Sequence, residues 1–460
     1  MLFDILVRFL DYRAFYTSEG ISPLSLYLQV TPGINRPPSL FFLNDSPVFT
    51  VFLFSLLVVG SLTLTLGFRT KLVGWFCWLL LVSLNRRNII PLNSGDSYFA
   101  LVLLWANFLP WGDAFSLEAQ DNSGDDNQAF SSLASFCYIC QVAILYSFSA
   151  ILRVGPEWQI DGSALYYVLS NDALEGPLAS FLLNFGSEFL SFFTFSVLFF
   201  ELLGPILLFV PSQRVRLLAV FFLVSFHLGI AGSMSIGFFP YHCIVAALAL
   251  LPSNLWETQL GARFYRNGSR AFFSLRSVFA RLYPEIRWMS KTQRDDRVGK
   301  IISWIPVILL LLALSFLVDD PYSSEPDPLS VRLARALHVD QRWGMFSPKP
   351  PKKSELARCE ARTQSGLEVN LLDEGRLSTI VDFSYRRKPI YKARWLQYTG
   401  HASRDRAHAQ LVLFSLVKRW NKQHPEDPVL SAQFLSSVHK LEPGYMLGFR
   451  RDEIKAAYSK

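Results

Sequence analysis

Residues 47–68 read PVFTVFLFSLLVVGSLTLTLGF and contain no charged side chain. A helix needs about 20 mostly apolar residues to cross the hydrocarbon core of a bilayer, so this run is long enough to span it. Comparable apolar runs cover 71–84, 97–111, 130–152, 188–210, 216–236, 238–252 and 301–318, and a shorter one covers 1–10. The sequence therefore predicts an all-α polytopic membrane bundle with about eight or nine transmembrane helices. The mixed segment 163–187, which Gly and Pro interrupt, is expected to be interfacial or re-entrant.

Composition and charge divide the chain into parts. Hydrophobic residues make up 51% of the 460 residues and charged residues only 18%, whereas soluble domains average about 25% charged residues. The charges are scarce before about residue 255 and dense after it. We therefore predict a transmembrane domain at 1–252, a basic loop at 253–300, a last transmembrane helix at 301–318 and a soluble domain at 319–460.

The soluble part is predicted to be an α+β domain. LEVNLLDEG (367–375) is typical of a strand followed by a turn. AQLVLFSLVKRWNKQ (409–423) has apolar residues at helical spacing, which predicts an amphipathic helix.

Loop charges predict the orientation. The loop 253–300 carries ten Lys and Arg residues against four acids, which predicts a cytoplasmic location. The soluble part then lies on the non-cytoplasmic side of a multi-pass inner-membrane protein. This rule, rather than nucleic-acid binding, accounts for the net charge of +7. One loop violates the rule, because it places Arg86 and Arg87, in NRRN (85–88), on the non-cytoplasmic side of the membrane. A ligand on that face or a salt bridge to the soluble part would each explain them.

Few residues suggest chemistry. The sequence lacks a P-loop, a dinucleotide-binding glycine pattern and an HExxH motif, and its seven histidines are scattered, so no metal site is predicted. Cys137 and Cys140 form a Cys-x-x-Cys pair that is either a thiol–disulfide site or apolar filling. Glu201 and His227 lie within apolar runs, where each is either functional or part of a structural hydrogen bond.

The stretch YSFSAILRVGPEWQIDG (146–162) ends an apolar helix on a charge. Arg153 and Trp158 together are typical of a membrane interface, where arginine extends its charge toward water and tryptophan anchors. Gly155 and Pro156 would end the helix.

Several motifs together resemble a known family. They are FYTSEGISP (15–23), NRRNIIPLNSGD (85–96), ILRVGPEWQIDGSALYYVLS (151–170), ELLGPILLF (201–209) and FHLGIAGSMSIGFFPYHCIVAALALLP (226–252). Over about residues 1–252 the chain resembles the horizontally transferred transmembrane (HTTM) family, the bacterial relative of vitamin K-dependent γ-glutamyl carboxylase. QRWGMFSPKP (341–350) looks like the tail of many such bacterial proteins. The resemblance implies a bundle open to the non-cytoplasmic face, a reduced quinone as cofactor and a secreted peptide or protein as substrate.

Two positions depart from the carboxylases. Counted back from Trp158, the catalytic lysine position reads Arg153, and arginine stays charged and cannot act as that base. The histidine position reads Asp96. Glutamate carboxylation is therefore not expected, and Arg153 would instead hold a quinone oxygen, a carboxylate or a lipid phosphate.

The resemblance and the charge pattern give one candidate site. Its proposed catalytic residues are Arg153, Asp96, Glu201 and His227, and its proposed ligand-binding residues are Arg86, Arg87 and Trp158. A carboxylase-like enzyme acting on a quinone or secreted peptide predicts a cavity beside these residues. A non-enzymatic membrane module for maturation, anchoring or export predicts an apolar partner surface on the tail. A thiol-redox role would use Cys137 and Cys140.

Overall fold

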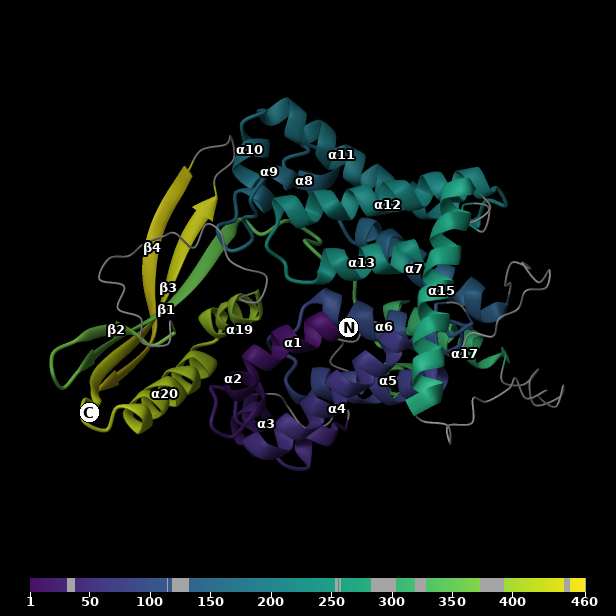
Figure 1. The fold of residues 1–460 in the computed structure, drawn as a ribbon. Coiled ribbons are helices and arrows are strands. Elements are labelled where there is room, and N and C mark those ends of the chain that lie inside the picture. The colour runs from purple at the N-terminus through teal and green to yellow at the C-terminus, as the bar shows by residue number, and fades with distance from the viewer. Residues whose placement is uncertain are drawn as a thin grey trace.

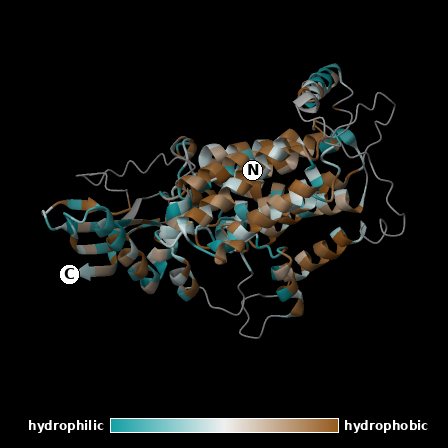
Figure 2. Cartoon of the chain, turned by 60° about the horizontal axis from the view of Figure 1, so that its bottom comes forward, coloured by the Kyte–Doolittle hydropathy of each residue, from teal (hydrophilic) through white to brown (hydrophobic). Residues whose placement is uncertain are grey.

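The computed structural model describes residues 1–30, 38–113, 115–117, 132–252, 255, 258–282, 303–318, 328–372, 393–441 and 447–459. Helices form an elongated bundle, and a small sheet with its covering helices lies at one end of it (Figure 1). A single helix, α15 (Gln259–Leu282), crosses the opposite end of the bundle. In Figure 2 the bundle helices are mostly hydrophobic and the sheet mostly hydrophilic.

The described residues of the first half of the bundle form eight helical segments. They are α1 (Leu2–Leu10), α2 (Tyr12–Tyr16), α3 (Leu24–Val30), η2 (Leu40–Phe42), α4 (Pro47–Leu66), α5 (Thr70–Arg87), α6 (Ser94–Ala106) and α7 (Leu133–Ile151).

The second half continues with α8 (Pro156–Gln159), α9 (Ala164–Leu169), α10 (Ala179–Leu183), α11 (Ser187–Leu203), η3 (Gly204–Phe209), α12 (Gln213–Ser233), α13 (Phe239–Leu248) and α17 (Ile305–Val318). Pro205 lacks a backbone N–H, and the chain changes from α- to 3-10-helix at this point. The segment 163–187 contains the two short helices α9 and α10.

Within the part of the chain that the structure describes, four helices are long and apolar enough to cross a membrane: α4, α7, α11 continued by η3, and α12. The expected eight or nine spans are not confirmed among the described residues. Every predicted apolar run does contain a helix, but α1, α6, α13 and α17 have 9, 13, 10 and 14 residues. Helix α5 has 18 residues and ends in Arg86 and Arg87. The coarser prediction, a helical bundle with apolar spans, is confirmed.

Local signals in the sequence set the bounds of α4. The Ser46 hydroxyl accepts a hydrogen bond from the Phe49 N–H, and Pro47 occupies the first turn, where its missing N–H costs nothing. Gly67 ends the helix at φ +69°, a left-handed conformation that glycine adopts without strain.

The C-terminal part has the predicted α+β composition. It contains α18 (Leu329–Ala336), β1 (Lys353–Thr363), β2 (Glu368–Asn370), α19 (Ala393–Arg404), α20 (Arg406–Gln423), β3 (Val429–Leu441) and β4 (Leu447–Ser459). The strands form one antiparallel sheet in the order β2-β1-β3-β4. The predicted strand in 367–375 is β2 and the predicted amphipathic helix is α20, whose face of Val412, Leu413, Leu416, Val417 and Trp420 is buried.

The C-terminal part packs directly against the first helices of the bundle. The Tyr398 hydroxyl donates to the Ile21 carbonyl at 3.0 Å, and the Tyr398 ring lies 5.3 Å from that of Phe15. The Trp395 indole donates to Asp11 at 2.9 Å. One buried apolar cluster therefore runs from α1 and α4 into α19, α20 and the sheet. Residues 283–300 of the basic loop lie outside the described residues.

Candidate functional site

A segment after α18, residues 341–348 and here called the strap, enters the core of the bundle. Trp343 has no exposed surface, and its ring meets the ring of Tyr98 edge-on at 5.7 Å. Its indole N–H donates to Gln341 Oε1 at 2.8 Å, and Gln141 Nε2 donates to the same oxygen at 2.7 Å. Gln141 in turn accepts from the Trp105 indole at 3.2 Å. This hydrogen-bonded chain holds the strap inside the bundle.

Arg153 follows the end of α7 and is buried. Its guanidinium forms an ion pair with Glu201 of α11 and lies 4.3 Å from the ring centroid of Trp158, a cation–π distance. Its Nε also donates to the carbonyl of Met345 in the strap at 3.3 Å. The structure thus brings together Arg153, Glu201 and Trp158, and it places Arg153 in a buried pair rather than at an exposed interface.

The strap and the turn after α7 are fastened to each other. The Trp158 indole donates to the Phe346 carbonyl at 3.0 Å, and the Gly155 N–H donates to the Pro348 carbonyl at 2.8 Å. A Cβ added to Gly155 would lie 2.6 Å from that carbonyl oxygen, so only glycine permits this approach.

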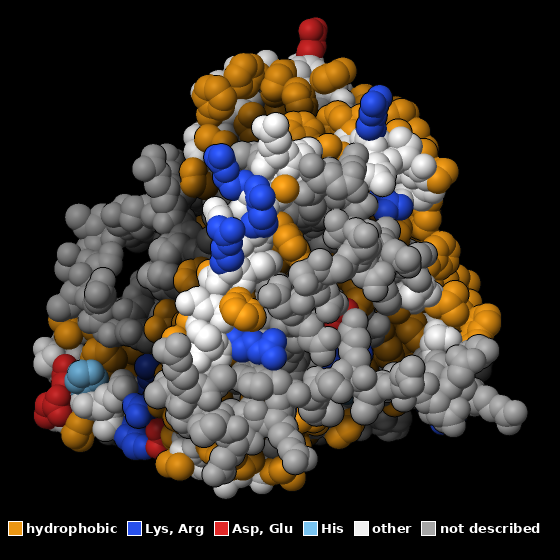
Figure 3. All heavy atoms as spheres, turned by 45° about the vertical axis from the view of Figure 1, so that its right-hand side comes forward, with side chains coloured by type: hydrophobic (Ala, Val, Ile, Leu, Met, Phe, Trp, Pro, Cys, Tyr) orange, Lys and Arg blue, Asp and Glu red, His pale blue; other side chains and the backbone are white. Residues whose placement is uncertain are grey.

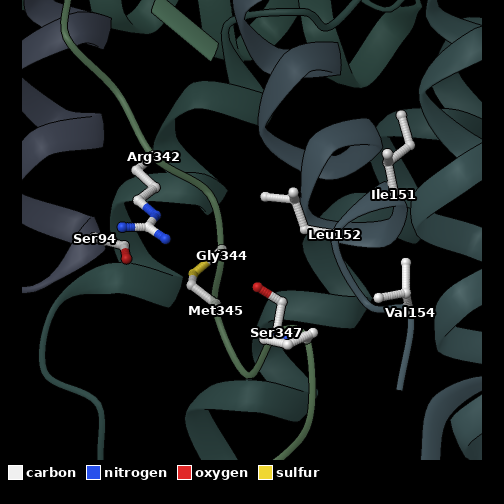
Figure 4. Close-up of a pocket in the computed structure, with 9 residues that line it drawn as sticks. Ser94, Ile151, Leu152, Val154, Arg342, Gly344, Met345 and Ser347 are labelled. Carbon is white, nitrogen blue, oxygen red and sulfur yellow. The ribbon is translucent and has the colours of Figure 1, made fainter. Parts of the chain in front are cut away.

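A pocket of about 500 Å³ lies between the strap and the end of α7 (Figure 4). Its lining residues are Ser94, Ile151, Leu152, Val154, Arg342, Gly344, Met345, Ser347 and Pro348. The guanidinium of Arg342 lies beside Ser94 and Met345, and the three aliphatic side chains from the end of α7 lie on the other side. The pocket therefore combines apolar walls with one cation and two hydroxyls, and it adjoins the residues on either side of Arg153.

Asp96 belongs to a second cluster, the charge network, which also contains Asp4, Arg8 and Arg394. The Asp96 carboxylate accepts from Arg8 Nη2 at 2.7 Å and from Arg394 Nη1 and Nη2 at 3.0 and 2.7 Å. Asp4 accepts from Arg8 Nε at 3.0 Å and from Arg394 Nη2 at 3.2 Å. All four side chains are buried, and their formal charges cancel. Burial lowers the pKa of Arg394, but the two carboxylates outweigh it and hold the guanidinium charged.

His227, on α12, has one neutral partner. Its Nε2 lies 2.7 Å from the Tyr146 hydroxyl, while its Nδ1 makes no hydrogen bond with any described residue.

The two arginines of NRRN lie in different places. Arg86 forms an ion pair with Asp340, and its Nε lies 3.3 Å from His338 Nδ1. This is the salt bridge to the tail, one of the two explanations for a charge on this face. Arg87 is fully buried and donates to the Ser22 carbonyl at 3.1 Å; its Nε and Nη1 make no hydrogen bond with the described residues.

The two remaining candidate chemistries, thiol redox and metal binding, find no support among the described residues. Cys137 and Cys140 are free thiols, the first buried and the second half-buried. Across the described ranges, no three His, Cys, Asp or Glu side chains are grouped so that they could hold a metal ion.

Sequence reasoning missed several site residues. Asp4 and Arg8 could have been found from the sequence. An acid and a base four residues apart within an apolar run favour a buried ion pair. Nothing local singled out Arg342 or Arg394, which the fold brings to Ser94 and Asp96 from far along the chain.

The comparisons with known proteins agree with the resemblance. The model of the HTTM domain family matches residues 40–256. That stretch contains α4 to α13, and thus Asp96, Arg153, Glu201 and His227. A relation to the vitamin K-dependent carboxylases is consistent with this family. No curated protein and no solved structure matches the chain.

Proposed function

Because residues 40–256 are an HTTM domain, we propose that this is an integral membrane protein that binds a quinone in the pocket between α7 and the strap. The observation that carries the proposal is the composition of the pocket. Aliphatic and thioether groups suit a quinone ring and its tail, while Arg342 and Ser94 offer hydrogen-bond donors to a carbonyl oxygen.

The charged residues argue against glutamate carboxylation. Arg153 forms a buried ion pair with Glu201, and Asp96 forms buried ion pairs with Arg8 and Arg394, so neither side chain is placed to act as a base. Of the proposed catalytic residues, His227 alone has a side-chain nitrogen, Nδ1, that makes no hydrogen bond with a described residue and pairs with no described charge. Arg153, Glu201 and Trp158 would then shape the wall of the site from behind Leu152 and Val154, as positioning residues.

Quinone extraction tests this proposal. We expect a quinone to be recovered with the wild-type protein purified from its native membranes. The Met345→Trp variant, which fills the pocket, should retain at least five-fold less quinone, and Arg342→Gln should retain less than wild type. Ile454→Trp changes an exposed residue of β4 and serves as the matched control. Unchanged quinone content in folded Met345→Trp protein would place the ligand elsewhere.

A second candidate is the binding of a secreted peptide during its maturation or export. Strand β4 is an edge of the sheet, and 13 residues of it pair on one side only with described strands. Such an edge can accept an extended peptide as an additional strand. Recovery of a peptide instead of a quinone in the same extraction would favour this candidate.

A further inference from the structure

Helix α15 has two unlike faces. Its 24 residues include five arginines and no acidic residue. Arg263, Arg266 and Arg270 are exposed and recur at a spacing of three and four, which places them on one side of the helix. Leu275 is turned about 140° from Arg270 around the helix axis, and Val278, one turn further on, lies between the two directions, on the apolar side of Arg270.

The apolar side of α15 is not covered by the described part of the bundle. Leu275 is 42% exposed and Val278 48% exposed. A contact with the bundle lies elsewhere on the helix, where Tyr265 meets Phe115 edge-on at 5.3 Å. A helix with an uncovered apolar side and a basic side is typical of a segment that lies in the membrane interface.

The position of α15 fits that interface. It crosses the end of the bundle away from the sheet and runs crosswise to α12 and α13, which have apolar surfaces (Figure 1). Viewed from that end, Lys and Arg side chains follow one another over the surface (Figure 3). Trp304, just before α17, is 57% exposed, as expected for an aromatic residue at headgroup level.

We propose that α15 lies in the plane of the bilayer and binds anionic phospholipid headgroups through Arg263, Arg266 and Arg270. Guanidinium groups form bidentate hydrogen bonds with phosphate, and with no acid on the helix their charges are not offset locally. Leu275 and Val278 would enter the acyl boundary below the headgroups. This inference is independent of the quinone pocket, because the two sites share no residue.

Lipid titration of the full-length protein in detergent is the first test. We expect short-chain phosphatidylglycerol to bind at least five-fold more tightly than short-chain phosphatidylcholine. Replacing Arg263, Arg266 and Arg270 together by Gln should abolish this preference, and replacing them by Lys should keep part of it. The matched control replaces three exposed arginines of the C-terminal part, Arg332, Arg404 and Arg406, by Gln. An unchanged preference in the α15 variant would overturn the proposal.

A second measurement keeps the arginines intact. An environment-sensitive fluorophore is attached to the cysteine of the Leu275→Cys protein, and its emission is measured in nanodiscs with and without phosphatidylglycerol. Wild-type protein labelled in the same way gives the background from the native cysteines. We expect a blue shift that grows with the anionic lipid. Fluorescence typical of water in both nanodiscs, with tight binding of polyglutamate or RNA, would instead assign this surface to a soluble acidic partner and overturn the lipid proposal.

Discussion

Arg394 of α19 donates hydrogen bonds to both carboxylate oxygens of Asp96 at the start of α6, at 3.0 and 2.7 Å. This bidentate pair joins the C-terminal part to the HTTM domain at a point with almost no exposed surface. Asp96, which occupies the histidine position of the carboxylases by resemblance, is therefore engaged in holding two parts of the chain together.

Removal of the Arg394 guanidinium should destabilise the protein strongly. Arg394→Gln leaves Asp96 and Asp4 with Arg8 as their one cation in the charge network, and breaking a buried ion pair typically costs about 3–5 kcal/mol. The midpoint of thermal unfolding in detergent measures the loss. Arg404→Gln is the control, since the Arg404–Glu355 pair is exposed and such pairs contribute about 0–1 kcal/mol. Equal shifts for both variants would contradict this account.

The Arg153–Glu201 pair should show strong coupling. Arg153→Leu strands a buried carboxylate, and Glu201→Leu strands a buried guanidinium, so each single variant should lose stability. The double variant should be less destabilised than the sum of the two, with a coupling energy of about 0.5–3 kcal/mol. Survival of folded protein after heating, followed by size-exclusion chromatography, gives the four values. Additive losses would show that the two side chains act separately.

Gly155→Ala should displace the strap. The new Cβ would lie 2.6 Å from the Pro348 carbonyl oxygen, too close for the hydrogen bond from the Gly155 N–H to keep its length. We expect faster cleavage of the strap by protease and weaker quinone retention. Gly400→Ala is the matched control, because no atom lies within 4 Å of its added Cβ. Equal cleavage rates in the two variants would mean that the strap tolerates the shift.

His408 should make the C-terminal part acid-sensitive. Burial and the neighbouring His401, whose Nδ1 lies 3.0 Å from that of His408, lower the pKa of His408 to about 4 from an ordinary value near 6.5. Between these values the unfolded chain takes up a proton that the folded chain does not. The free energy of unfolding should therefore keep its whole His408 contribution above about pH 7, and it should fall as the pH decreases toward 4.

The control for this pH dependence is His408→Asn, which offers a neutral hydrogen-bonding group near the Nδ1 position. Thermal midpoints at pH 7.5 and pH 5 should differ less in this variant than in wild type. The difference between the two pH values is the measured quantity, because the substitution itself also changes packing. A wild-type midpoint that does not change between these pH values would refute the role assigned to His408.

Local patterns predicted the helices better than the number of spans. The charge-free run at 47–68 predicted the bounds of α4 to within two residues. The reason is that the residues capping this helix, Ser46 and Gly67, can be recognised from the sequence. The number of spans depended on helix length, and α13 stops after 10 residues although its apolar run extends to 252. Apolar composition alone does not distinguish a span from a short helix buried among others.

The candidate site was predictable where its contacts are local. Arg153 and Trp158 are five residues apart, and their cation–π contact follows from the turn that Gly155 and Pro156 impose. The salt bridge from Arg86 to the tail is one of the two explanations that the violated loop rule had left open. The partners of Asp96 were not, since a side chain 298 positions away reaches it only through the packing of α19 on α1.

Trp343 has a further consequence for how the protein is made. It fills the interior between α6 and α7, yet it is translated after every helix of the HTTM domain. The last buried residue of this core is therefore synthesised more than two hundred residues after α6, the first helix of the same core. The packing of this core in its final form therefore requires a side chain that is synthesised after α4 to α13.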